Sequence, residues 1–135
     1  MAKPIRLFAA ALLTASMAAC SGVSSPSTQA TEEFSDTLAP LGQVSKPFSV
    51  SKTGEMQLTL KSLTPRPVVG FIALAIGVPN GSACSPIPGY VVSQAAVGQQ
   101  YAFPQITKGA YCLLVADANG ALTASATFTV SLSHP

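Results

Sequence analysis

The chain has 135 residues, of which 48% are hydrophobic and only 9% are charged. Its formal net charge of +2 comes from Lys3 and Arg6, because the rest of the chain carries equal numbers of basic and acidic side chains. A neutral chain without a basic stripe has no electrostatic footprint for nucleic acid, so nucleic-acid binding is excluded.

Residues 1–19 predict a bacterial export signal: a basic start, an apolar run over residues 7–13, and small residues before Cys20. Ser-Met-Ala-Ala-Cys at residues 16–20 resembles a lipobox, whose cysteine receives lipid, although Met17 stands where leucine is usual. Two alternatives remain open. An ordinary signal peptidase could cut after Ala18 and release a soluble protein. The segment could also stay uncleaved, but its apolar run is shorter than the ~20 residues that span a bilayer.

Residues 20–36 are rich in Ser and Thr and show no apolar period, which predicts a flexible tether. Residues 37–135 then form one domain of ordinary size. Within it, apolar and polar residues alternate over 44–51 and again over 56–61, and the short segment 52–54 predicts a hairpin between these two strands. Pro47 cannot donate a ladder hydrogen bond, so the first strand is expected to lie at a sheet edge or to carry a bulge.

Residues 68–78 are apolar on both faces, which predicts a buried central strand, and they are too few to cross a membrane. Pro and Gly interrupt residues 81–100, which are expected to form a loop with a short strand at 90–92.

Three further strands are expected at residues 101–103, 109–117 and 122–132, and Asn119-Gly120 predicts a hairpin turn between the last two. The whole pattern predicts an all-β fold, a single antiparallel β-sandwich of about 7–8 strands.

Cys84 and Cys112 are expected to form a disulfide, because Cys20 is assigned to lipid and the compartment outside the cytoplasm is oxidising. A redox pair and a metal site are the alternatives. Neither is favoured, since the chain has no Cys-x-x-Cys spacing and its one histidine is His134.

The segments 109–117, 120–123 and 128–135 resemble the end of small exported bacterial β-sandwich domains and, more distantly, the pre-peptidase C-terminal (PPC) domain of secreted hydrolases. The resemblance implies a non-catalytic, immunoglobulin-like sandwich. Some relatives bind calcium through clusters of acidic side chains, whereas Glu55 and Asp117 are the only acidic residues in 37–135. No metal and no other cofactor is therefore expected.

No catalytic residue is expected. No serine lies in a Gly-x-Ser-x-Gly elbow, and His134 is interpreted as part of a frayed tail. Asp117 begins an Asp-Ala-Asn-Gly turn, where capping of backbone N–H groups is favoured over metal ligation. Tyr111 is expected in the core or as a tyrosine-corner residue.

The leading functional hypothesis is a lipid-anchored cell-envelope protein, a non-catalytic structural or interaction module with a protein or polysaccharide partner. Ser21 after the cysteine is compatible with sorting to the outer membrane, so a location in the outer membrane or periplasm is expected. The second is a secreted carbohydrate- or peptide-binding module that uses Tyr90 and Tyr101, whose rings would then be exposed on one surface. The third, an enzyme or a metal-dependent protein, requires clustered titratable groups in a cleft.

Overall fold

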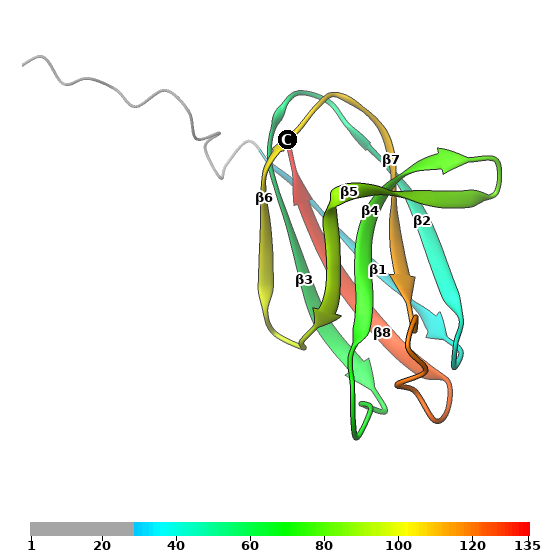
Figure 1. Cartoon of the computed structure of the whole chain (residues 1–135). Coiled ribbons are helices and arrows are strands. Elements are labelled where there is room, and N and C mark those ends of the chain that lie inside the picture. Colours follow the sequence, from blue (N-terminus) through cyan, green and yellow to red (C-terminus); the bar gives the residue numbers. More distant parts are fainter. Residues whose placement is uncertain (1–28) are drawn as a thin grey trace, which may run out of the picture.

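The computed structural model describes residues 29–135; the predicted signal, Cys20 and the first part of the predicted tether lie outside this range. Within it the chain forms eight antiparallel strands in two four-stranded sheets (Figure 1). The predicted all-β sandwich is confirmed. In chain order the strands are β1 (Ala30–Leu38), β2 (Gln43–Val50), β3 (Gly54–Thr64), β4 (Ile72–Asn80), β5 (Ala83–Ala95), β6 (Gln100–Ile106), β7 (Gly109–Ala116) and β8 (Ala126–His134).

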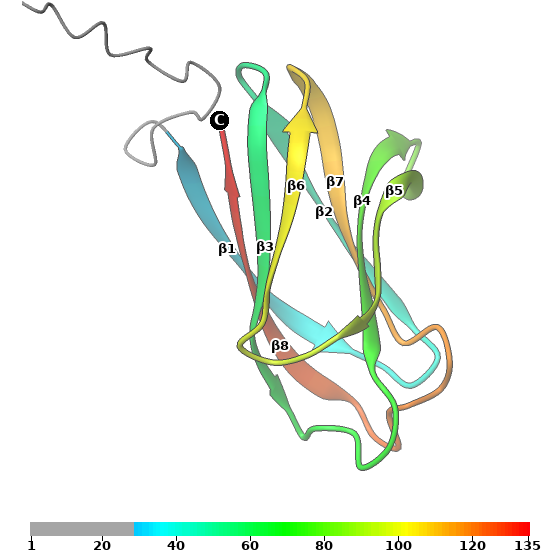
Figure 2. The ribbon, with the colours of Figure 1, turned by 60° about the vertical axis from the view of Figure 1, so that its left-hand side comes forward.

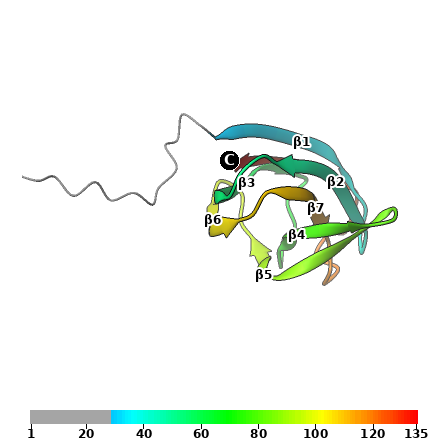
Figure 3. The same cartoon turned by 90° about the horizontal axis from the view of Figure 1, so that it is seen from above.

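One sheet has the strand order β1-β8-β3-β6 and the other β2-β7-β4-β5. β4 and β5 are the only two strands that follow each other in the chain and also lie in the same sheet. Every other connection crosses from one sheet to the other. This is the order of an eight-stranded jelly roll, in which two Greek keys build the sandwich; an immunoglobulin sandwich arranges its strands differently. Seen from above, β1 and β5 lie on opposite sides of the molecule (Figure 3).

Both predicted hairpins are wrong, although the strands themselves exist. β2 pairs with β7, and β3 pairs with β8 and β6. In the same way, β7 and β8 lie in different sheets. A short turn with glycine suits a corner between sheets as well as a hairpin within one, and each strand keeps its own inward face in both arrangements.

The first strand begins before the expected end of the tether. Residues 30–36 belong to β1, which pairs with β8 along its full length, from Ala30 opposite His134 to Leu38 opposite Ala126. Phe34 and Leu38 face the core, but the remaining positions are mostly polar. Hydrogen bonding to β8 orders this segment, and composition alone does not reveal such a partner.

The predicted loop over residues 81–100 is also corrected, because most of it is β5, 13 residues long. Pro86, Pro88 and Gly89 are tolerated because β5 is an edge strand and its pairing with β4 shifts register between Ala75 and Gly77. The edge position of β2 around Pro47 and the central position of β4 are confirmed.

The main core lies between the sheets and is built from the inward-facing residues of both. A second, smaller cluster lies on the opposite face of the β4 and β7 sheet and consists of Ala75, Cys84, Cys112 and Leu114. β4 and β7 therefore carry apolar residues on both faces. The largest fully buried side chains of the main core are Phe128, Leu38, Met56, Leu58, Leu60, Ile72, Leu74, Ile76, Leu113, Leu132, Val115 and Val130.

Candidate functional site

Three connections gather at one end of the sandwich: the β1–β2 turn, the β3–β4 loop and the β7–β8 loop (Figure 2). They are in contact, since a Cβ built on Gly70 would lie 3.0 Å from Ala121 Cβ, and one on Gly120 would lie 3.1 Å from Leu41 Cδ2. β1 starts at the opposite end with Ala30 and runs toward this one. At ~3.3 Å per residue, its length separates the two ends by roughly 30 Å.

This end exposes large apolar side chains. Val68 is 96% exposed, Val69 81% and Leu41 75%, and Phe71 is also exposed. These four residues are here called the distal apolar surface. The prediction that residues 68–78 are all buried is wrong at both ends. Residues 68–71 precede β4, which starts only at Ile72, and Val78 within β4 is exposed. Contiguous exposed apolar groups mark interaction sites more often than single ones do.

The β3–β4 loop is flanked by two hollows. One, of about 240 Å³, lies toward residues 95–97 and includes Arg66 and Phe71 in its lining. The other, of about 430 Å³, lies between Val68, Val69 and residues 119–123. Arg66 is exposed and makes no salt bridge within residues 29–135. The loop therefore presents an apolar tip with one unpaired cation beside it.

Asp117 holds these loops together from inside. Its buried carboxylate accepts hydrogen bonds from the backbone N–H groups of Leu41 at 3.0 Å, Ala121 at 2.7 Å and Leu122 at 3.2 Å. Burial pushes the pKa of Asp117 up, but these three hydrogen bonds outweigh it and hold the pKa below the ordinary value of 3.8. The predicted capping role of Asp117 is confirmed, and it fixes the β1–β2 turn to the β7–β8 loop.

The two tyrosines predicted to contact a ligand do not form one site. Tyr101 accepts a hydrogen bond from the Ala96 N–H at 2.8 Å and donates one to the Gln94 carbonyl at 3.2 Å. Tyr90 instead lines a separate groove of about 440 Å³ together with Tyr111. Both predicted residues are half-buried, and Tyr101 does not line the groove of Tyr90, so the two rings do not form the single surface that the second hypothesis describes.

Tyr111 closes a tyrosine corner, as expected: its hydroxyl donates to the Thr107 carbonyl four residues upstream at 3.0 Å. The partnership of Tyr111 with Tyr90 was missed at the sequence level. The sequence gives little indication that these two tyrosines line one groove, because they lie on different strands and β6 separates them in the chain.

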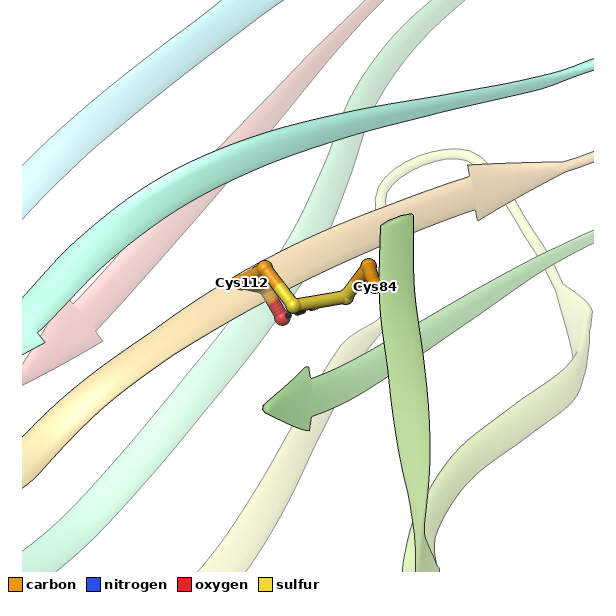
Figure 4. Close-up of a disulfide and its surroundings, with 2 residues drawn as sticks. All are labelled: Cys84 and Cys112. Carbon is orange, nitrogen blue, oxygen red and sulfur yellow. Dashed lines mark hydrogen bonds between the residues drawn. A yellow bond between two sulfur atoms is a disulfide. The ribbon is translucent and has the colours of Figure 1, made fainter. Parts of the chain in front are cut away.

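The disulfide between Cys84 and Cys112 is present (Figure 4). It joins β5 to β7, although β4 lies between these strands in the sheet. The bridge therefore passes over β4 at Gly77, which pairs with Cys112 on one side and with Pro86 on the other. It fastens the tip of the β4–β5 hairpin to the outer face of the sheet.

His134 is not a frayed tail. It is 3% exposed at the end of β8, and its Nε2 lies 3.0 Å from Glu32 Oε1 while its ring packs against Phe48. The pairing of β8 with β1 carries it into the fold.

Among residues 29–135, no three His, Cys, Asp or Glu side chains gather closely enough to hold a metal ion. That part of the chain also has no helix long and apolar enough to cross a membrane.

The fold and these sites define an all-β, disulfide-bridged sandwich with an apolar loop surface at one end. No protein-family model matches the sequence, and no curated protein is similar to it. Among solved structures, the chain is similar to PliG of Aeromonas hydrophila, a periplasmic lysozyme inhibitor of g-type lysozyme. The TM-score is 0.50 at 12% identity, over 82% of this chain and 91% of that one. At this identity the similarity concerns the fold alone, and it gives the PPC resemblance no specific support.

Proposed function

We propose that this chain is an exported, lipid-anchored cell-envelope protein that binds a protein partner through the distal apolar surface and carries out no catalysis itself. The observation that carries the proposal is the near-complete exposure of Val68 and Val69, side by side at the tip of one loop. Removing a valine side chain from water is worth about 1.5 kcal/mol or more. A partner that covers both would therefore gain substantial affinity from them alone.

The architecture supports a docking role because the surface is presented on a fixed support. Asp117 ties the β1–β2 turn, which carries Leu41, to the β7–β8 loop, and Ala121 of that loop lies against Gly70 in the β3–β4 loop. β4 begins directly after Phe71. Loops held in one conformation lose little entropy on binding. Arg66, exposed beside the apolar tip, adds a cation that an acidic group on the partner would complement.

The arrangement of the ends supports presentation away from a membrane. The chain enters the sandwich at Ala30, whereas the distal apolar surface lies at the far end of β1. A lipid on Cys20 would hold the domain by the first of these ends and leave the second facing outward. The similarity to PliG supports a protein as the partner, since that neighbour is a protein inhibitor of another protein.

Site-specific photo-crosslinking tests the proposal. A photoreactive residue placed at Val68 in the full chain, in the bacterium that makes it, is expected to yield a discrete protein adduct. The matched control is Val91, which is half exposed but lies on β5. Equal adduct patterns at the two positions, or none at Val68, would contradict the proposal.

A g-type lysozyme is the first defined partner to test. If it is the partner, the purified protein slows lysis of a cell-wall suspension, and Val68→Ser with Val69→Ser weakens this inhibition by about 100-fold. The control pair, Val78→Ser with Val91→Ser, removes exposed valines elsewhere and retains inhibition. Unchanged lysis in the presence of wild-type protein would exclude this enzyme as the partner and leave the crosslinked adduct to identify another.

A further inference from the structure

A second site lies on the other side of the domain, in the groove lined by Ile87, Tyr90, Gln105, Ile106, Thr107 and Tyr111. Its volume of about 440 Å³ falls in the range of small-molecule sites. It is formed by β5, the end of β6, the β6–β7 turn and the start of β7. The distal apolar surface contributes no residue to it.

Two tyrosine rings of the groove are held in the same way. Tyr90 stacks on Phe103 with ring centroids 5.2 Å apart, and its hydroxyl donates to the Gln105 carbonyl. Tyr111 stacks on Phe48 at 5.9 Å, and its hydroxyl donates to the Thr107 carbonyl. Each ring is thus fixed by a core phenylalanine and by a backbone hydrogen bond. Aromatic walls that are already fixed bind a ligand with little further loss of side-chain entropy.

The polar groups of the groove are uncharged. Gln105 offers a side-chain amide that makes no hydrogen bond within residues 29–135, and Thr107 offers a hydroxyl 3.0 Å from the Tyr111 oxygen. Both phenol hydrogens are donated to carbonyls, so the phenol oxygens remain as acceptors. No Lys, Arg, His, Asp or Glu lines the groove.

We infer that this groove binds a neutral saccharide. A pyranose ring presents a C–H face, which packs on an aromatic ring, and a rim of hydroxyl groups, which pair with amides and hydroxyls. The groove supplies both kinds of group from fixed positions, and the absence of charge in its lining disfavours an ionic ligand. The inference stands independently of the proposed protein partner, because the two surfaces share no residue.

Titration of the ¹⁵N-labelled disulfide-bonded protein with tetra-N-acetylchitotetraose and with cellotetraose tests the inference by NMR. The expected result is a saturable shift of backbone signals from residues 87–90 and 105–111 with at least one of these sugars at millimolar concentration. Gln105→Ala removes only the free amide and is expected to weaken binding about fivefold. Tyr90→Ala, which removes a ring wall, is expected to weaken it more than tenfold.

Tyr101→Phe is the matched control, since it removes a hydroxyl outside the groove and should leave the affinity unchanged. Val68→Ser with Val69→Ser should also leave it unchanged. No saturable shift with either sugar would overturn the inference, as would shifts confined to other residues or unaltered binding by a folded Gln105→Ala protein. Equally strong binding of an uncharged tetrapeptide in the groove would overturn the choice of saccharide as the ligand class.

Discussion

Asp117 is the residue on which the distal loops depend. One carboxylate satisfies three backbone N–H groups that come from two separate connections, and it lies fully buried beneath them. A buried N–H group that loses its acceptor lowers stability by about 1–3 kcal/mol, and the loss is at the upper end of this range when the acceptor is charged. This ionised side chain therefore joins the β1–β2 turn to the β7–β8 loop, and Ala121 of that loop lies against Gly70 of the β3–β4 loop.

Replacing this carboxylate should lower stability in a pH-dependent way. The pKa of Asp117 is lower in the folded than in the unfolded protein. The carboxylate therefore contributes fully to stability at pH values above its unfolded pKa of about 3.9, and this contribution is lost as the pH falls through the folded pKa. Asp117→Asn is expected to lower the free energy of unfolding by about 3 kcal/mol at pH 7 and by much less at pH 2. Urea denaturation at both pH values measures this.

Asp36→Asn is the control for this prediction, because Asp36 forms a solvent-exposed ion pair with Lys46 at 2.6 Å. Water screens exposed pairs of this kind, so the effect of Asp36→Asn on stability should be small at either pH. An Asp117→Asn protein that unfolds at the wild-type urea concentration would show that the loops are held by other contacts.

At the residue level, the sequence predicts the role of a polar side chain more reliably than it predicts whether an apolar side chain is buried. The Asp-Ala-Asn-Gly turn predicted the capping role of Asp117, because a short carboxylate at the start of such a turn reaches the N–H groups that follow. Val68 and Val69, in contrast, were predicted in a buried strand, since their side chains do not differ in kind from those of β4. Where a strand begins depends on its neighbours β5 and β7, which local pattern does not contain.

At the level of elements, the β4–β5 hairpin is held both by strand pairing and by a covalent bond to β7. Its tip is fastened by the Cys84–Cys112 disulfide, which crosses β4 at Gly77. A Cβ on Gly77 would lie 2.8 Å from Cys84 Sγ and 2.7 Å from the Ser85 carbonyl carbon, closer than real Cβ atoms approach. Only glycine at this position leaves room for the bridge.

Gly77→Ala is accordingly expected to lower the free energy of unfolding by about 2 kcal/mol through overpacking. The matched control is Gly109→Ala, whose added Cβ would meet only the Tyr111 ring at an ordinary 3.4 Å. Thermal unfolding of both proteins, with thiol titration to verify the disulfide, measures the difference. Equal stability of the two variants would contradict the expected crowding at Gly77.

The elements also show what pattern can and cannot predict. Alternation identified the inward face of β3, because apolar burial acts on each strand separately. It did not identify strand partners, because β2 and β3 follow each other closely yet lie in different sheets. Pairing is decided by contacts between distant segments, such as β1 with β8, and no local signal encodes them.

The edges of both sheets explain several residues that looked like strand breakers. Proline interrupts three of the four edge strands, at Pro47 in β2, Pro86 and Pro88 in β5, and Pro104 in β6. The fourth edge strand, β1, carries acidic side chains instead. Proline and charge at edges prevent a further strand from adding to the sheet. The prolines and acidic residues that obscured β5 and β1 at the sequence level thus lie on sheet edges, where they hinder pairing with another chain.

At the scale of the whole molecule, a lipid on Cys20 would determine which end of the domain is held at a membrane. Intact-mass measurement of the membrane fraction is expected to show a lipid-sized increment for the wild-type protein that Cys20→Ala lacks. The same spectrum should show the loss of two hydrogens from Cys84 and Cys112 in both proteins. An unmodified soluble wild-type protein would instead support ordinary cleavage and secretion.

The position of β1 has a mechanical consequence. The chain enters at Ala30, and β1 runs from there to the distal end beside β8 over its whole length. A force between a membrane-held tether and a partner at the distal end would therefore act along the strand axis. The hydrogen bonds between β1 and β8 would then carry the load together, in shear, and would not open one after another as in peeling. A domain built in this way would resist unfolding while it is pulled between a tether and a bound partner.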